Sequence, residues 1–213
     1  MTAAASSPNE RSERRMREVR DAARRVIARN GLETTTMRDI SREGGFTTGV
    51  LTHYFPDKQA VIVGAFAAAS EEWIAEARSR LERARDAEEE LVALAELALP
   101  TAGARRAEWR LWAEMWAYAG RDPAFAAQLV DTDALWEREI RQVLERARAA
   151  GLLGEIDAAA EAAVLARLID GLGLRAWLSG RWEDARERLV YHMGTLGVPR
   201  RVLRRMRMQG GDG

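Results

Sequence analysis

Apolar residues recur along most of the chain at intervals of three and four, and no segment alternates apolar and polar residues as a half-buried strand does. The first such stripe contains Met16, Val19, Ala23, Val26 and Ile27. It predicts an amphipathic helix that begins after Pro8 and stops at Gly31, a residue type that readily takes the left-handed conformation that ends helices. The pattern indicates an all-α protein.

Prolines and glycines divide the rest of the chain into further helices. Two short helical segments flank Gly44-Gly45, and a long helix follows Pro56-Asp57 and reaches roughly Arg85. Beyond it we predict helices near residues 87–99, 104–119, 124–150, 157–179 and 183–196, with room for a shorter basic helix after Pro199. The expected total is about nine helices. Residues 1–8 and the Gly-Gly-Asp-Gly end are expected to be disordered.

Residues 36–55 form a helix, a tight glycine-containing turn and a second helix, which is the arrangement of a helix-turn-helix. Thr36 followed by Asp39 resembles a capping box, and Thr47 is suited to cap the second helix. Five apolar residues are expected to bury the pair against the first helix of the chain: Met37, Ile40, Phe46, Leu51 and Phe55.

The second helix of this motif then presents small polar residues outward. Thr47, Thr48, Val50, Thr52 and His53 can approach base edges, and Gly49 leaves room for the duplex. Tyr54 is suited to a phosphate contact, and Asp57 caps a following helix whose N-terminus and Lys58 face another phosphate. The predicted DNA-binding residues are Thr36, Arg38, Thr47, Thr48, Gly49, Val50, Thr52, His53, Tyr54 and Lys58.

The run from Glu10 to Phe66 resembles the DNA-binding domain of the TetR family of repressors. The matching features are the Gly31 stop, the threonines before the second helix, Gly45-Phe46-Thr47-Thr48-Gly49, His53-Tyr54-Phe55 and Asp57-Lys58. Many members have tyrosine where this chain has Thr52, which puts that contact in doubt. The resemblance implies a dimer that binds a palindromic double-stranded operator with two half-sites about 34–36 Å apart.

The C-terminal part is similar to the glycine-betaine-pathway (BetI-type) repressors. The similar segments are Leu168 to Leu172, Leu174 to Ala176, Leu178 to Gly180, and Trp112 to Trp116 with Pro123 downstream. The resemblance implies an effector-binding domain whose last two helices form a four-helix dimer interface. The expected interface residues are Val164, Leu165, Leu168, Leu172, Leu189, Val190 and Met193.

We therefore expect residues 9–56 to form the DNA-binding domain, residues 57–198 the effector-binding and dimerisation domain, and residues 199–213 a basic tail. The tail is expected to be solvated by default, although its arginines could touch acidic groups of the body or DNA. Residues 1–60 hold eleven Lys/Arg and eight Asp/Glu, and the tail holds five arginines and one aspartate, so the middle carries the negative charge. A basic head on an acidic body fits a head that meets a polyanion.

Trp109, Trp112 and Trp116 share one helix face at spacings i, i+3 and i+7. One interpretation is an aromatic wall of an effector pocket, where Glu114 or Asp170 adds negative charge and the rings attract a cation by about 0.5–2 kcal/mol each. Further candidates for this pocket are Trp73, Trp136 and Trp177. The other interpretation is core or dimer packing, since aromatic stripes usually mean burial. Asp170 could instead pair with Arg175 or with the partner subunit.

Composition narrows the function. The 213 residues are 47% hydrophobic and 31% charged, with no cysteine and two histidines. No run of 18 apolar residues exists and residues 1–9 lack the apolar core of a secretory signal, so we expect a cytoplasmic protein with no membrane partner. We expect neither a metal site nor a cofactor, and no arrangement of residues indicates an enzyme. The main hypothesis is a repressor released by an unidentified small molecule; the alternative is an effector-independent architectural or cell-cycle factor.

Overall fold

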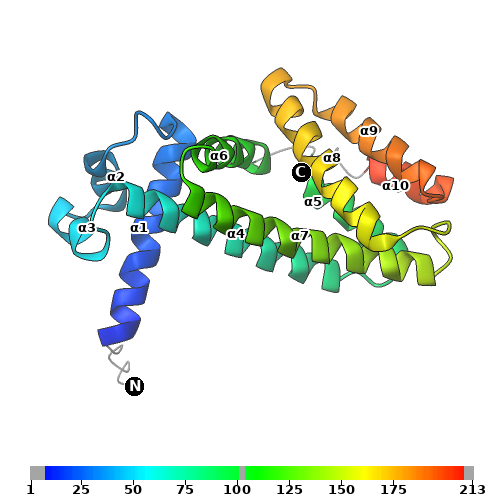
Figure 1. The fold of residues 1–213 in the computed structure, drawn as a ribbon, viewed down its shortest axis with the longest axis horizontal. Coiled ribbons are helices and arrows are strands. Elements are labelled where there is room, and N and C mark those ends of the chain that lie inside the picture. Colours follow the sequence, from blue (N-terminus) through cyan, green and yellow to red (C-terminus); the bar gives the residue numbers. More distant parts are fainter. Residues whose placement is uncertain (1–7, 101–103, 209–213) are drawn as a thin grey trace. The chain divides into compact units, whose positions relative to one another are not determined.

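The computed structural model describes residues 8–100 and 104–208, and every regular element within them is an α-helix (Figure 1). The elements are α1 (Pro8–Asn30), α2 (Met37–Gly44), α3 (Thr48–Tyr54), α4 (Lys58–Glu82), α5 (Ala87–Ala98), α6 (Ala104–Ala119), α7 (Pro123–Ala149), α8 (Ala158–Ser179), α9 (Trp182–Thr195) and α10 (Arg200–Met208). The all-α prediction is confirmed. Because α10 forms, the described residues contain ten helices rather than about nine.

The chain divides into two compact units, residues 1–71 and 72–213. The N-terminal unit holds α1, α2, α3 and the first half of α4, and its core combines Val26 and Ile27 of α1 with Ile40, Leu51 and Phe66. Gly31 ends α1 with a φ of 85°, as expected from its left-handed preference. The division between the two units falls within α4, whereas the domain boundary predicted from sequence follows residue 56, just before that helix. The assignment of DNA binding and effector binding to separate domains stays a prediction.

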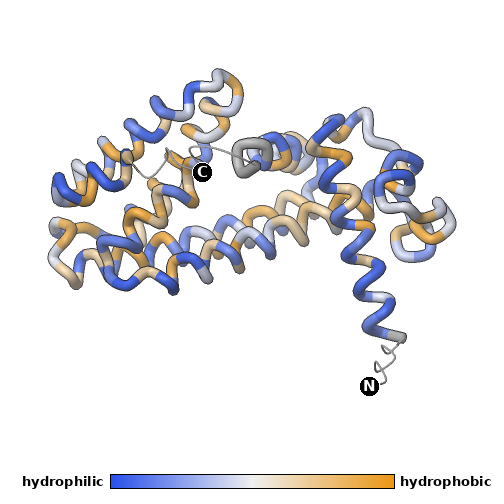
Figure 2. The backbone as a smooth tube through the Cα atoms, turned by 180° about the vertical axis from the view of Figure 1, so that it is seen from behind, coloured by the Kyte–Doolittle hydropathy of each residue, from blue (hydrophilic) through white to orange (hydrophobic). Residues whose placement is uncertain are grey.

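The larger unit is built around α5, which is apolar over most of its length and buried on nearly all sides. Helices α7, α9 and α10 pack against α5, and α8 packs against both α7 and α9. In Figure 2 hydrophilic and hydrophobic segments alternate along the longer helices, as amphipathic helices in one core require. None of the helices in residues 8–100 and 104–208 has the length and apolarity needed to cross a membrane.

Helix α10 corrects the expectation of a solvated tail for residues 200–208. Val202 and Met206 are buried against the core, and the Arg201 guanidinium pairs with Glu88 of α5. Amphipathic spacing explains this docking, because its two buried residues lie four apart while the arginines take the other face. The predicted disorder of the two chain ends concerns residues that lie outside the described ones, except Pro8, which begins α1.

Arg186 of α9 connects α10 and the end of α5 through hydrogen bonds. Its guanidinium is almost completely buried and donates hydrogen bonds to the carbonyl oxygens of Met206 at 2.7 Å, Leu99 at 2.8 Å and Ala95 at 3.1 Å. Burial lowers the pKa of Arg186 from its usual value. Helix ends leave carbonyl groups without partners within the helix, and here one arginine satisfies such groups from two helices.

Candidate functional site

Reciprocal hydrogen bonds fix the start of α2. The Asp39 backbone N–H donates to the Thr36 hydroxyl at 3.2 Å, and the Thr36 backbone N–H donates to the Asp39 carboxylate at 3.1 Å. The Thr36 hydroxyl also donates to that carboxylate at 2.6 Å, and this hydrogen bond lowers the pKa of Asp39. The capping box predicted from sequence is confirmed.

The turn between α2 and α3 depends on two glycines with different roles. Gly45 has a φ of 68°, in the left-handed region that favours glycine. Gly44 has ordinary helical geometry, but a Cβ there would lie 2.0 Å from ring atoms of Phe46. The Phe46 ring therefore folds back over the end of α2, and only glycine fits at position 44 without displacing that ring.

Helix α3 presents the surface expected of a recognition helix. The side chains of Thr47, Thr48, Thr52 and His53 are exposed, whereas Leu51 is fully buried and holds the helix on the core. Thr47 caps the helix by accepting the Val50 backbone N–H at 3.3 Å. The Thr52 hydroxyl donates to the carbonyl oxygens of Thr48 and Gly49, so its donor is already used within the helix.

The start of α4 differs in one respect from the sequence-based picture. Asp57 caps the helix as expected, accepting the Ala60 backbone N–H at 2.8 Å. The Lys58 ammonium, predicted to face a phosphate, instead donates to the carbonyl oxygens of Leu32 at 3.0 Å and Glu33 at 3.3 Å. Two of its three donors thus hold the segment between α1 and α2, and one is left for another acceptor.

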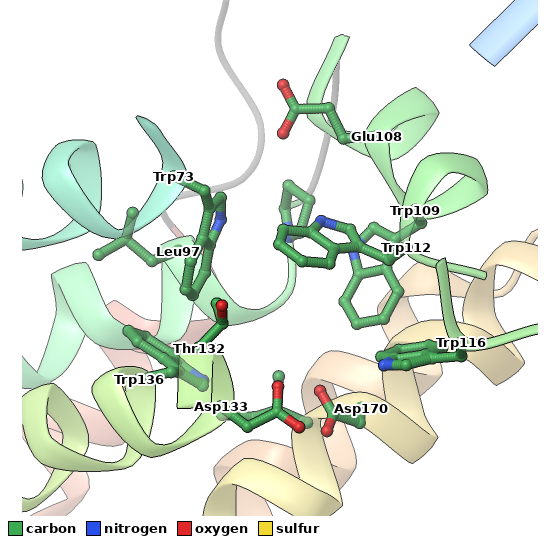
Figure 3. A pocket seen from close by; sticks show the side chains of 12 residues that line it. Trp73, Leu97, Glu108, Trp109, Trp112, Trp116, Thr132, Asp133, Trp136 and Asp170 are labelled. Carbon is green, nitrogen blue, oxygen red and sulfur yellow. The ribbon is translucent and has the colours of Figure 1, made fainter. Parts of the chain in front are cut away.

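The larger unit contains a pocket of about 60 Å³ in which five of the twelve lining residues are tryptophans (Figure 3). Its walls come from α4, α6, α7, α8 and the end of α5. The lining residues, which we call the tryptophan pocket, are Trp73, Leu97, Pro100, Glu108, Trp109, Trp112, Trp116, Thr132, Asp133, Trp136, Ile169 and Asp170.

The indoles of the tryptophan pocket support one another through edge-to-face contacts. The ring centroids of Trp73 lie 5.8 Å from those of Trp112 and 4.6 Å from those of Trp136, at interplanar angles of 78° and 73°. Trp109 lies 6.1 Å from Trp116, with the rings tilted by 58°. Such contacts are favourable for aromatic quadrupoles, and they hold the rings in fixed orientations around the cavity.

Two carboxyl groups, of Asp133 and Asp170, close one side of the pocket and point toward one another (Figure 3). Burial, together with the neighbouring charge of Asp133, raises the pKa of Asp170 to about 7, and burial also raises the pKa of Asp133. Arg167 is near enough to oppose both shifts, but its guanidinium pairs with Glu137 at 2.6 Å. In the described part of the chain neither aspartate has a hydrogen-bonding or ion-pair partner. The cavity therefore offers aromatic faces beside two carboxyl groups of raised pKa.

Most of the effector-pocket residues expected from sequence do line this cavity: Trp73, Trp109, Trp112, Trp116, Trp136 and Asp170. Glu114 does not, because it lies on the side of α6 away from the tryptophan stripe. Trp177 does not either, because it is two turns, about 10 Å, beyond Asp170 along α8. The stripe packs within the core and also lines the cavity, and its role in binding an effector stays a prediction.

Sequence reasoning missed Asp133, Thr132 and Glu108. Asp133 precedes Trp136 by three residues and Glu108 precedes Trp112 by four, so each lies one turn from a pocket tryptophan. That spacing was the available signal. Asp170 makes no contact with Arg175 in the structure, and faces the cavity instead.

The predicted dimer residues separate into two groups. Leu165, Leu189, Val190 and Met193 are fully buried in the core of their own unit, so their prediction as interface residues is corrected: they pack against neighbouring helices of the same chain. Val164 is 53% exposed, and Leu168 and Leu172 are half-buried. Two further apolar residues of α8 and α9, which the sequence-based prediction did not include, are also exposed, namely Leu178 at 66% and Tyr191 at 74%.

Family models of known proteins match both the N-terminal and the C-terminal part of the chain. The family model for bacterial regulatory proteins of the tetR family matches residues 19–64, and the model for the C-terminal part of BetI-type transcriptional repressors matches residues 87–195. The HTH-type transcriptional regulator BetI of Burkholderia cenocepacia strain HI2424 is 30% identical over 181 residues, covering 82% of this chain and 90% of that protein.

Solved structures give the same result. A transcriptional regulator of Saccharomonospora viridis, crystallised in complex with choline, is 29% identical with a TM-score of 0.79, covering 89% of this chain and 100% of that one. A TetR-family regulator from Rhodococcus sp. shares the fold at 23% identity and a TM-score of 0.72, covering 87% and 99% of the two chains. Proteins of this family are transcriptional regulators rather than enzymes. The chain belongs to the TetR family, as a transcriptional repressor of the BetI type.

Proposed function

We propose that this repressor binds its operator as a homodimer and is released by a small quaternary ammonium compound held in the tryptophan pocket. The observation that carries the proposal is a cavity that combines five tryptophans with the paired carboxyl groups of Asp133 and Asp170. Each ring face attracts a desolvated cation by about 0.5–2 kcal/mol, and a carboxylate adds a direct charge interaction. A quaternary ammonium group suits such a cavity because it has no N–H donors that need partners there.

The choline bound to the Saccharomonospora viridis regulator supports this class of ligand. Choline is a cation with a short hydroxyethyl arm, and Thr132 offers a hydroxyl in the same cavity. A zwitterion such as glycine betaine is expected to bind more weakly, because its carboxylate would face two aspartates.

For DNA we propose contacts from the exposed side of α2 and α3. Thr48, Val50 and His53 are suited to the floor of the major groove, whereas Tyr54, Arg38 and the remaining donor of Lys58 are suited to phosphates. Because the Thr52 hydroxyl already donates within α3, Thr52 is left to accept a hydrogen bond or to place its methyl group on thymine. Thr36, Thr47 and Gly49 complete the proposed surface, in which the two threonines are also helix caps.

For the dimer we propose a stripe on α8 that contains Val164, Leu168 and Leu178, continued by Tyr191 of α9. Residues 164, 168 and 178 share one side of α8 because 3.6 residues complete a turn. Helices α8 and α9 pack against one another, and exposed apolar side chains on neighbouring helices are typical of a surface that another subunit covers.

The proposed switch uses α4, the helix that follows the recognition motif. Asp57 caps its start, Lys58 lies in its first turn, and Trp73, about four turns further along, lines the tryptophan pocket. One continuous helix therefore links the DNA-binding motif to the cavity. An effector that takes operator occupancy from nearly full to nearly empty must favour the released state by about 10⁴-fold, or about 5.5 kcal/mol. As a regulator of chromosomal DNA, the protein is proposed to act in the cytoplasm.

To test the proposal, the purified dimer is titrated with choline and with its uncharged carbon isostere, 3,3-dimethylbutan-1-ol. Tryptophan fluorescence measures ligand binding, and a DNA-binding assay measures release from the operator. We expect saturable binding and release with choline alone. Trp112→Leu should abolish binding, whereas Trp177→Leu, outside the pocket, should retain it. Equal responses to the two ligands, or no response to any quaternary ammonium ion, would exclude the proposed effector class.

The operator is found by selecting genomic fragments with the purified protein and footprinting the fragment bound most tightly. A protected palindrome is expected, with affinity that falls as salt is raised. Binding without sequence preference would favour the architectural alternative. An effector-independent factor needs no cavity in its larger unit, so the presence of the tryptophan pocket is an argument against this alternative.

A further inference from the structure

Gly173 of α8 lies directly against the indole of Trp109. A Cβ at position 173 would be 1.9 Å from Cη2, 2.0 Å from Cζ2 and 2.4 Å from Cζ3 of that indole. These atoms belong to the six-membered ring, so the outer part of the indole occupies the space that any other residue's side chain would fill. Non-bonded carbon atoms do not approach within 3 Å, and an alanine here would therefore displace the ring or the helix.

The glycine is not explained by the backbone. Residue 173 is inside α8 and has no positive φ, so its backbone suits any residue. Glycine in a helix interior is less favourable than alanine, and its presence needs a packing or functional reason. Two residues earlier, Gly171 is exposed, and a Cβ there would meet nothing within 4 Å. The two glycines thus share a helix and a backbone conformation, and differ in whether an indole covers them.

The indole of Trp109 is closely packed among other aromatic rings. It is buried, and its centroid lies 6.1 Å from those of both Trp116 and Trp182. Trp182, at the start of α9, is itself buried and does not line the pocket. Trp109 itself lines the tryptophan pocket, together with Asp170, which precedes Gly173 by one turn of α8. A side chain at position 173 therefore pushes the indole into a cavity of only about 60 Å³.

We propose that Gly173 sets the size limit for the effector, because its missing side chain lets Trp109 recede against α8 and keeps the pocket open. The inference rests on the proposed function, since the ligand is the quaternary ammonium ion assigned above. Gly173 is a positioning residue: it acts on the effector only through the indole that it accommodates.

The test compares Gly173→Ala with the matched control Gly171→Ala in the full-length dimer, using tetramethylammonium, choline and tetraethylammonium as probes. For Gly173→Ala we expect affinity to fall by about tenfold or more for tetraethylammonium and choline, with a smaller loss for tetramethylammonium. Gly171→Ala should bind all three as the wild type does. Dimer mass and operator affinity without ligand should be unchanged in both variants.

A rescue variant separates this role from a general loss of structure. The atoms of Trp109 that meet position 173 belong to the six-membered ring of the indole, and a phenyl ring carries no such second ring. Gly173→Ala combined with Trp109→Phe should therefore regain affinity for the two larger ions. A loss that is equal for all three ions and is not rescued would overturn the proposal. So would wild-type affinities in Gly173→Ala.

A second readout does not depend on any ligand. Displacement of Trp109 changes its coupling with Trp116 and Trp182, so the near-ultraviolet circular dichroism of Gly173→Ala should differ from those of the wild type and of Gly171→Ala. If the wild type binds none of the three ions, the proposed function fails and this spectrum alone judges the position of the indole. An unchanged spectrum would overturn the inference in either case.

Discussion

Replacement of Asp170 by asparagine should stabilise the ligand-free protein and at the same time weaken its response to a cation. Asp170 shares the tryptophan pocket with Asp133, and burial followed by the charge of Asp133 raises its pKa to about 7. The fold therefore opposes ionisation of a group that the proposed effector needs in its ionised form. Asparagine has nearly the same shape and carries no charge, so it removes both effects together.

The pKa shift determines the size and sign of the effect on stability. In the unfolded chain Asp170 titrates near its ordinary pKa of 3.8, whereas in the folded protein it titrates near 7. Between these pH values the folded state holds the extra proton, so the free energy of unfolding falls as pH rises, and it levels off above pH 7. Three pKa units correspond to about 4 kcal/mol, an upper bound that water in the pocket reduces. Asp170→Asn should thus gain about 1–3 kcal/mol at pH 8, and nearly nothing at pH 4.

Cation binding should show the opposite preference. With a pKa of about 7, roughly one tenth of Asp170 is ionised at pH 6 and roughly nine tenths at pH 8. If the effector binds the ionised form, its affinity rises about tenfold between these pH values, and binding releases about half a proton per site at pH 7 and nearly one at pH 6. Asp170→Asn should bind more weakly at pH 8 and lose this contribution to the pH dependence.

Urea unfolding at pH 4 and pH 8 measures the first effect, and calorimetric titration with choline in buffers of different ionisation enthalpy measures the second. Asp131→Asn is the matched control, because Asp131 lies on α7, which also forms a wall of the pocket, but its own side chain is exposed and outside the pocket. A variant Asp170→Asn that is less stable than the wild type at pH 8 would refute the burial argument. Choline affinity that is independent of pH in the wild type would refute the role of the ionised carboxylate.

Three further predictions concern the other parts of the structure. Arg186→Met leaves the carbonyl groups of Leu99 and Met206 without the arginine that donates to them, and should lower the free energy of unfolding by about 2–4 kcal/mol in urea titrations. A loss below about 0.5 kcal/mol would show that these hydrogen bonds do not hold α10 to α5. Thr36→Ala removes the side-chain half of the capping box and should cost about 1 kcal/mol in the same assay, whereas Thr36→Ser should retain most of it. Val164→Glu should shift the dimer toward monomer in light-scattering measurements and weaken operator binding, and a variant that stays fully dimeric would contradict the proposed α8 stripe.

Local sequence features were enough to predict where the helices begin and end. Thr36 and Asp39 lie three residues apart, Gly31 follows the last turn of α1, and Asp57 precedes α4, so each signal acts within one turn of backbone. The same holds for the tryptophans of α6, whose common face follows from helical spacing alone. These interactions are short-ranged, and therefore they can be recognised before the tertiary structure is known.

Long-range packing decided which apolar face meets which neighbour. Leu165 and Val164 are adjacent on α8, yet Leu165 is fully buried in its own unit and Val164 is exposed on the stripe that we propose for the partner subunit. Likewise the sequence showed that Arg200 to Arg207 could form a helix, but not that Val202 and Met206 would insert beside α5. Hydrophobic burial has no direction of its own, so the pattern indicates that a face is covered without indicating what covers it.

The electrostatics of the tryptophan pocket could not be predicted from the sequence. The sequence by itself determined an all-α chain, a helix-turn-helix with its caps, and a stripe of indoles that includes Trp109 and Trp112. Only the tertiary structure placed Asp133 of α7 beside Asp170 of α8 and turned Glu114 away from them. Electrostatic coupling between two carboxyl groups depends on their distance and burial, and for residues on different helices both quantities arise only when the helices pack.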